Sequence, residues 1–216
     1  MGAAFRAAVA GAPTAVSSDP VDPGATPRNI SLSLPYYLID AFPFDGDLDC
    51  ARAIACANAF GMAHFLAQDR VLDDDERPTT ENVAFSDTCL LRFAAGYASV
   101  FPGDSAFWDH ASSYFDEYFG SLSWERRRLW GDDGCSIVAG PAFSQTLDML
   151  GRKMSPLKCT VAAVSLLTDR TELLEGGSRF VDCYHAAYQL SDDLSDLAPD
   201  AARGRWSVPL RLLERS

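Results

Sequence analysis

The chain has 216 residues, with 18 Lys and Arg against 30 Asp and Glu, and its formal net charge is −12. Hydrophobic residues make up 48 % and charged residues 22 %, a balance that excludes wholesale disorder and predicts a single domain with one sizeable core. The negative charge repels phosphate backbones and anionic lipid, so nucleic acid and membrane surfaces are not expected as partners. An acidic protein that handles an anionic substrate needs divalent cations between the two.

The first 28 residues contain Ala, Gly, Pro, Ser and Asp without apolar periodicity, and we expect a disordered leader at 1–28. Their apolar stretch lacks the Leu-, Ile- or Val-rich centre of a signal peptide. No apolar run approaches the ~20 residues that cross a bilayer, so we expect a cytoplasmic protein without stable membrane insertion. The six cysteines stand singly and are expected to be small buried side chains, not disulfides or zinc ligands.

Residues 29–216 are predicted to form one helical domain. Strict period-two alternation with β-branched enrichment is absent, as are short hairpin turns between such runs. The sequence therefore predicts an all-α fold. Its helix-length segments, separated by Pro, Gly and Asp, are 31–42, 47–75, 81–101, 104–130, 141–151, 155–168 and 172–197.

An acidic cluster, Asp192, Asp193 and Asp196, lies near the end of the last segment. Helical residues advance by about 100°, so Asp192 and Asp196 lie about 40° apart and one turn, ~6 Å, along the axis, with Asp193 on the adjacent stripe. Such neighbouring carboxylates suit Mg²⁺, which takes one or two carboxylates per ion together with substrate phosphates. From these residues alone, a solvated acidic helix end is an equal alternative.

A second acidic pair, Asp69 and Asp73, ends the long apolar segment 47–75. The two residues share one helix face at i and i+4. Negative charge at a helix C-terminus opposes the macrodipole, where Lys or Arg is expected, and residues that break a local rule are more often functional. We interpret the pair as a second group of metal ligands; a polar helix terminus is the alternative.

Together these motifs resemble those of the class I isoprenoid synthases, the group that contains trans-prenyltransferases and class I terpene cyclases. Residues 188–196, Tyr-Gln-Leu-Ser-Asp-Asp-Leu-Ser-Asp, are similar to the family's second aspartate-rich motif. Residues 69–73, Asp-Arg-Val-Leu-Asp, resemble the first motif, Asp-Asp-x-x-Asp, with Arg70 in place of the second Asp. Residues 153–157, Lys-Met-Ser-Pro-Leu, resemble the Lys-Thr-x-x-Leu segment that supplies a diphosphate-binding lysine in prenyltransferases.

Downstream of the second motif, residues 200–209 resemble the Asp-x-x-x-Gly-Arg-x-x-x-Pro segment of phytoene and squalene synthases. The resemblance spans about residues 45–210. It implies a helical bundle around a central apolar cavity, with both aspartate motifs facing each other at the cavity mouth. Since 20 residues follow Asp196, fewer than the family uses to finish its bundle, we expect a bundle that lacks the last helices.

The resemblance also implies roles for single residues. Mg²⁺ ions would bind to Asp69, Asp73, Asp192 and Asp196, with Asp193 in the same catalytic set. The residues expected to contact a prenyl diphosphate substrate are Lys153, Gln189, Arg205, Phe65 and Tyr188.

The expected function is that of a Mg²⁺-dependent class I terpene synthase, which ionises a linear prenyl diphosphate and cyclises the carbocation. Fixed cations stabilise the departing diphosphate, and a dry aromatic pocket protects the carbocation. A trans-prenyltransferase is the alternative enzyme, although it must hold two diphosphates and no Lys precedes Lys153. A catalytically silent isoprenoid-synthase-like subunit is the alternative from another class, favoured by Arg70 and the short C-terminus. A homodimer or a partner subunit remains open.

Overall fold

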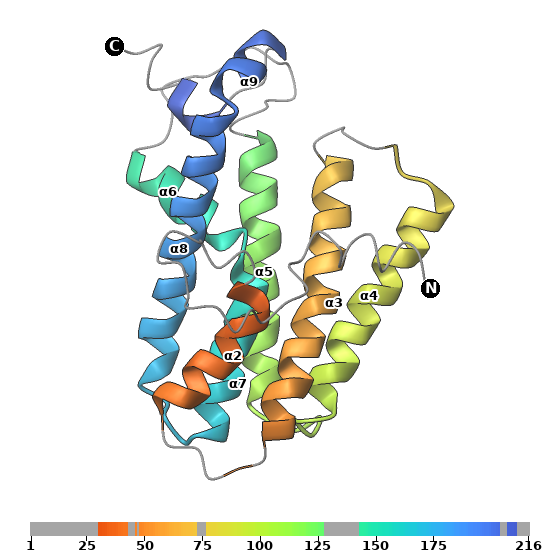
Figure 1. Cartoon of the computed structure of the whole chain (residues 1–216), viewed down its shortest axis with the longest axis vertical. Helices are drawn as coiled ribbons and strands as arrows, with labels where there is room; N and C mark the ends of the chain where they lie inside the picture. Colours follow the sequence, from red (N-terminus) through yellow and green to blue (C-terminus); the bar gives the residue numbers. More distant parts are fainter. Residues whose placement is uncertain are drawn as a thin grey trace, which may run out of the picture. The chain divides into compact units, whose positions relative to one another are not determined.

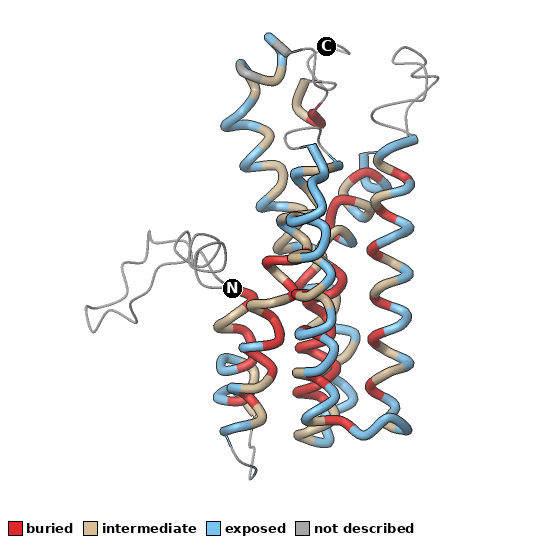
Figure 2. Tube along the Cα trace, turned by 90° about the vertical axis from the view of Figure 1, so that its right-hand side faces the viewer, coloured by how far each residue is buried: buried red, intermediate tan, exposed pale blue. Residues whose placement is uncertain are grey.

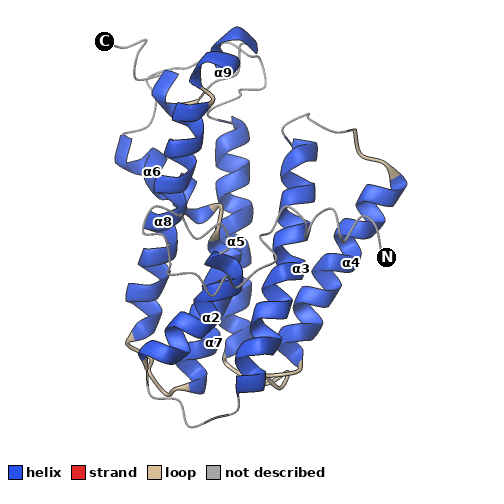
Figure 3. Ribbon diagram, in the orientation of Figure 1, coloured by secondary structure: helices blue, strands red, loops and turns tan. Residues whose placement is uncertain are grey.

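The computed structural model describes residues 30–42, 46, 48–72, 77–127, 143–203 and 207–210 (Figure 1). All regular secondary structure in these ranges is helical, and no strand occurs in them (Figure 3). The predicted all-α fold is therefore confirmed. The chain divides into two compact units, Met1–Ser105 and Ala106–Ser216. The prediction of one domain over 29–216 stays a prediction, and the leader predicted at 1–28 lies outside the described residues.

The helices from α2 to α8 match the predicted segments closely, whereas α9 was not predicted. Buried and exposed residues alternate along the helices (Figure 2). The first unit contains α2 (Ile30–Ala41), α3 (Leu48–Leu72) and α4 (Thr80–Ala98). The second unit contains α5 (Phe107–Glu125), α6 (Phe143–Arg152), the 3-10 helix η2 (Ser155–Leu157), α7 (Lys158–Leu167), α8 (Leu173–Ser195) and α9 (Leu197–Arg203). The segment predicted at 172–197 ends slightly earlier, because α8 stops at Ser195 and Asp196 caps it.

In the first unit, α3 packs on α2 and lies beside α4 (Figure 1). Two glycines allow the close approach of α3 and α4. A Cβ atom at Gly96 would lie 2.6 Å from the Cβ of Ala57, and one at Gly61 would lie 2.6 Å from the ring of Phe93. Small residues at these points let the two helix backbones approach each other closely enough to exclude water.

A chain of buried hydrogen bonds ties the three helices of the first unit together. The Tyr97 hydroxyl donates to Asn58 Oδ1 at 2.8 Å, and Asn58 Nδ2 donates to the Ser31 carbonyl at 2.7 Å. These residues belong to α4, α3 and α2. The buried amide thus has partners on both sides, as buried polar groups require.

The helix α3 is also the one described helix that is long and apolar enough to cross a membrane, and 44 % of the relevant window is buried inside the structure. Its buried residues include Ala51, Ile54 and Ala57, on the faces that pack against α2 and α4. Part of α3 is thus packed inside the first unit.

In the second unit, α7 is the central helix. Every residue from Ser155 to Ser165 is buried, and α7 packs against both α5 and α8. The approach of α8 to α7 depends on Gly177, where a Cβ atom would lie 2.5 Å from Val161 Cγ1. The chain leaves α7 through Asp169, which has a positive φ of 52°, a conformation that Asp tolerates better than most residues.

The cysteine expectation holds for some positions only. Cys89 and Cys159 are buried, and burial raises the pKa of the Cys159 thiol to about 12. Cys56 and Cys183 are exposed, so the expectation is wrong for them, because each lies on an outward face of its helix. Cys135 lies outside the described residues.

Candidate functional site

The second aspartate-rich motif lies at the C-terminal end of α8. The helix continues through Ser195, and the backbone N–H of Asp196 donates to the carbonyl of Asp192 at 2.9 Å. Asp192 and Asp196 are therefore one turn apart, and both side chains are exposed. Tyr188, one turn earlier in the same row, is 56 % exposed. The structure places these three residues as the helical spacing predicts.

Asp193 has a different environment. One of its carboxylate oxygens accepts a hydrogen bond from Gln189 Nε2 at 2.9 Å, and the other accepts the backbone N–H of Val208 at 3.2 Å. The side chain is half-buried. Asp193 and Gln189 thus join the end of α8 to the segment at residues 207–210, while Asp192 and Asp196 face outward.

The first aspartate-rich motif belongs to the other unit. Asp69 is half-buried in the last turn of α3, which ends at Leu72, and Asp73 lies outside the described residues. Phe65 packs within its own unit, edge-on to the Phe93 ring of α4 with 6.5 Å between centroids. The predicted meeting of the two motifs at one cavity mouth stays a prediction.

The basic residues expected at the diphosphate are Lys153 and Arg205. Lys153 follows α6 and forms an ion pair with Glu125 of α5, with 2.9 Å between Nζ and Oε2. Its side chain is 13 % exposed. Arg205 lies outside the described residues. A diphosphate role for Lys153 would therefore compete with this ion pair.

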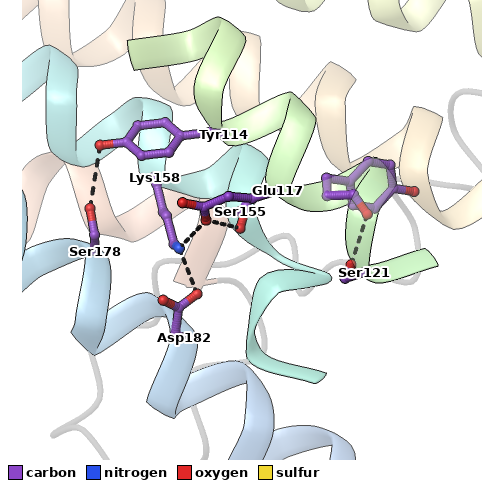
Figure 4. Close-up of polar contacts among 8 residues, drawn as sticks. Tyr114, Glu117, Ser121, Ser155, Lys158, Ser178 and Asp182 are labelled. Carbon is purple, nitrogen blue, oxygen red and sulfur yellow. Dashed lines mark hydrogen bonds and ion pairs between the residues drawn. The ribbon is translucent and has the colours of Figure 1, made fainter. Parts of the chain in front are cut away.

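A buried charge cluster that the sequence analysis missed lies in the interior of the second unit (Figure 4). The Lys158 side chain is 3 % exposed, and its Nζ lies 2.6 Å from Glu117 Oε2 and 2.7 Å from Asp182 Oδ1. Ser155 Oγ also donates to Glu117 Oε2, at 2.9 Å. The Tyr114 ring lies beside the ammonium, at 5.9 Å from its centroid.

One signal in the sequence could have revealed this cluster. Lys158 is the only charged residue in the apolar stretch 155–167. A lysine in a buried helix needs a carboxylate partner, since an unpaired buried charge costs several kcal/mol. The identity of the partners could not be read from the sequence, because Glu117 comes from α5 and Asp182 from α8.

The two carboxylates of the cluster respond to their surroundings in opposite ways. Burial is the largest single influence on Glu117 and raises its pKa. The hydrogen bonds from Lys158 and Ser155, together with the positive charges of Lys158 and Arg152, outweigh it, so the pKa lies below its usual value. For Asp182, burial is the largest influence, and together with the nearby negative charge of Glu117 it outweighs Lys158 and Arg152, so the pKa lies above its usual value. Asp182 is therefore the member of the cluster that binds a proton more readily.

Among the described residues, no three His, Cys, Asp or Glu side chains form a group that could hold a metal ion. The carboxylates of Asp192 and Asp196 lie on the same face of the helix and provide the hard oxygen donors that Mg²⁺ prefers. Mg²⁺ needs only one or two protein carboxylates when waters and phosphates complete its coordination shell. The chemistry of this donor pair fits the expected ion.

Comparison with protein-family models, with curated proteins and with solved structures finds no match to this chain.

Proposed function

We propose that the chain is a class I isoprenoid synthase that uses Mg²⁺ to ionise a linear prenyl diphosphate and then cyclises the carbocation. The observation that carries this proposal is that the three aspartates at the end of α8 have different surroundings. Asp192 and Asp196 are exposed one turn apart, whereas Asp193 is held by Gln189 and by the backbone of Val208. A helix end braced in this way presents two carboxylates in a defined direction.

The chemistry of the surrounding residues agrees with this assignment. Bound Mg²⁺ would neutralise the charge that develops on the leaving diphosphate. The carboxylates of Asp192 and Asp196 would hold the ions, and the exposed Tyr188 would offer a ring face to the hydrocarbon part of the substrate. Asp69 and Asp73 would also be ligands of Mg²⁺, and Lys153 and Arg205 would add positive charge.

We also propose that the enzyme is soluble and that it is cytoplasmic. The burial of α3 against α2 and α4 supports the first of these two properties.

The decisive experiment is an assay of diphosphate release from farnesyl or geranylgeranyl diphosphate by the purified chain, with Mg²⁺ and with the ion chelated. We expect release that needs Mg²⁺ and that Asp192→Asn or Asp196→Asn lowers at least tenfold. Asp116→Asn is a matched control, because Asp116 is exposed on α5 of the same unit. Equal release by the wild type and Asp192→Asn would end the assignment.

The same assay separates the two alternatives. A cyclase gives hydrocarbon or alcohol products from one prenyl diphosphate, without isopentenyl diphosphate. A trans-prenyltransferase gives a longer linear diphosphate only when isopentenyl diphosphate is supplied. No release under either condition, from a folded chain, would favour the catalytically silent subunit.

A further inference from the structure

The helix that carries the second motif makes a series of polar contacts with the elements around it. Within α8 only Val181 is buried, although the structure describes the whole helix. Its inward face instead makes a series of directional contacts with α5, α6, α7 and the segment after α9. These are Ser178 with the Tyr114 hydroxyl at 3.3 Å, Asp182 with Lys158 at 2.7 Å, His185 Nδ1 with the Leu150 carbonyl at 2.8 Å, and Asp193 with the Val208 N–H at 3.2 Å.

Lys158 is the central member of this series. Its ammonium lies between Glu117 of α5 and Asp182 of α8, and no other residue in the series carries a charge that is almost completely buried (Figure 4). The contact is also sterically confined. A Cβ atom at Gly151 would lie 2.7 Å from the Asp182 carbonyl oxygen, so the α6 backbone blocks movement of α8 on that side.

We propose that Lys158 is a positioning residue for the metal-binding carboxylates. Its ion pairs set the rotation and axial position of α8, and thereby the direction in which Asp192 and Asp196 face. This inference rests on the proposed function. A charged contact in the interior suits the task because a shift that separates the two groups leaves a buried charge uncompensated, whereas apolar contacts tolerate sliding.

Geometry shows why a small movement matters. Ten residues of continuous helix, about 15 Å, separate Asp182 from Asp192. A carboxylate about 6 Å from the helix axis moves by about 2 Å when the helix rotates by 20°. Mg²⁺ needs near-ideal octahedral geometry with oxygens at about 2.1 Å, and such sites tolerate errors of only about 0.5 Å. Loss of the Lys158 contact is therefore expected to weaken metal binding at a distance.

The test uses Asp182→Ala, which removes the contact between Lys158 and α8 but leaves Lys158 paired with Glu117. The buried charge thus stays balanced, unlike in Lys158→Met, which leaves two carboxylates without their ammonium. Asp182→Asn is the conservative variant, since it keeps a polar oxygen beside the Lys158 ammonium at nearly the same volume. Asp182→Ser is a second variant without the carboxylate, and it keeps a hydroxyl group where Asp182→Ala keeps no polar atom.

The readout is the shift in thermal midpoint as Mg²⁺ is titrated at a fixed concentration of inorganic diphosphate, because a ligand that binds the folded chain raises its midpoint. We expect Asp182→Ala and Asp182→Ser to raise the half-saturating Mg²⁺ concentration at least fivefold, and Asp182→Asn to stay within twofold of the wild type. Phe107→Leu is the control for lost stability, since Phe107 is 1 % exposed in the first turn of α5. It should lower the midpoint and leave half-saturation unchanged.

The outcomes are distinguishable. If the wild type shows no shift, or if Asp192→Asn shows the same shift as the wild type, the proposed function fails. If the wild type and Asp192→Asn differ as expected but Asp182→Ala and Asp182→Ser titrate like the wild type, the proposed function stands and the positioning role is wrong. If Phe107→Leu raises the half-saturating Mg²⁺ concentration as much as Asp182→Ala does, the positioning role is also overturned, because lost stability alone would then explain both changes.

Discussion

The carboxylate of Asp193 accepts the backbone N–H of Val208 at 3.2 Å, a contact between residues fifteen positions apart in the chain. Its other oxygen accepts from Gln189 Nε2 at 2.9 Å. Adjacent aspartates in one motif therefore have different surroundings, since Asp192 is exposed and Asp193 is half-buried. This difference separates the expected effects of their substitution.

We expect Asp193→Ala to lower the free energy of unfolding by about 1 kcal/mol, because a backbone donor and an amide lose their acceptor. Asp196→Ala, at an exposed position in the same motif, should change it by less than about 0.5 kcal/mol. Urea denaturation measures both values, and hydrogen exchange at the Val208 amide should quicken only in Asp193→Ala. Equal losses in the two variants would show that the tether to Val208 contributes nothing.

The two aspartate motifs are expected to contribute unequally to metal binding. The second motif has its full set of carboxylates, whereas Arg70 replaces one in the first. Asp192→Asn and Asp69→Asn should both raise the Mg²⁺ concentration needed for half-maximal diphosphate release, Asp192→Asn by several-fold more. A larger rise in Asp69→Asn would reverse the ranking of the motifs.

Two adjacent glycines in α8 provide a matched pair for the packing of α8 on α7. A Cβ atom at Gly177 would lie 2.5 Å from Val161 Cγ1, whereas one at Gly176 would meet nothing within 4 Å. Gly176→Ala should raise the free energy of unfolding by about 0.5–1 kcal/mol, because alanine has the higher helix propensity. Gly177→Ala should lower it by about 1–3 kcal/mol through overpacking. Urea denaturation measures both changes. An equal rise in the free energy of unfolding in both variants would contradict the close approach of α8 to α7 at Gly177.

The buried cluster predicts a specific dependence of stability on pH. The pKa of Asp182 is raised in the folded chain, chiefly by burial, so the folded state holds this proton more tightly than the unfolded state. The free energy of unfolding therefore rises as the pH falls through the raised pKa of Asp182. The rise is complete once the pH is below the ordinary pKa that Asp182 has in the unfolded chain. Asp182→Asn should exceed the wild type in free energy of unfolding at pH 7, and the difference should shrink as the pH falls toward the ordinary value.

Glu117 should change stability with pH in the opposite direction from Asp182. Burial is the largest single influence on its pKa, but the hydrogen bonds from Lys158 and Ser155 and the charges of Lys158 and Arg152 together lower the pKa below its ordinary value. The lowered pKa stabilises the folded chain at pH values above the ordinary pKa, and this contribution is lost as the pH falls through the lowered pKa. Glu117→Gln should be less stable than the wild type at pH 7, with a difference that shrinks in acid. Differences that are independent of pH in both variants would show that neither carboxylate titrates as the cluster requires.

The helices from α2 to α8 and the row that carries Tyr188, Asp192 and Asp196 followed from the sequence alone, whereas α9 was not predicted. Both depend on local spacing, since apolar periodicity and the Pro, Gly and Asp breaks determine where a helix begins and ends, and residues four apart in one helix share a face. The sequence also singled out Asp69 and Asp193, but it could not distinguish the tethered Asp193 from the exposed Asp192. That distinction depends on where Val208 lies after the chain leaves α8.

Only the tertiary structure determined which charges meet in the interior. The lysine chosen from the sequence motif, Lys153, is paired with Glu125, whereas Lys158 lies in the core between Glu117 and Asp182. Glu117 and Lys158 are 41 positions apart, and nothing in the local pattern of either segment specifies their contact. The sequence determines helices because neighbours along the chain interact within a few residues. Contacts between helices depend instead on how their faces pack, at Gly151 and Gly177 as much as at the charged residues themselves.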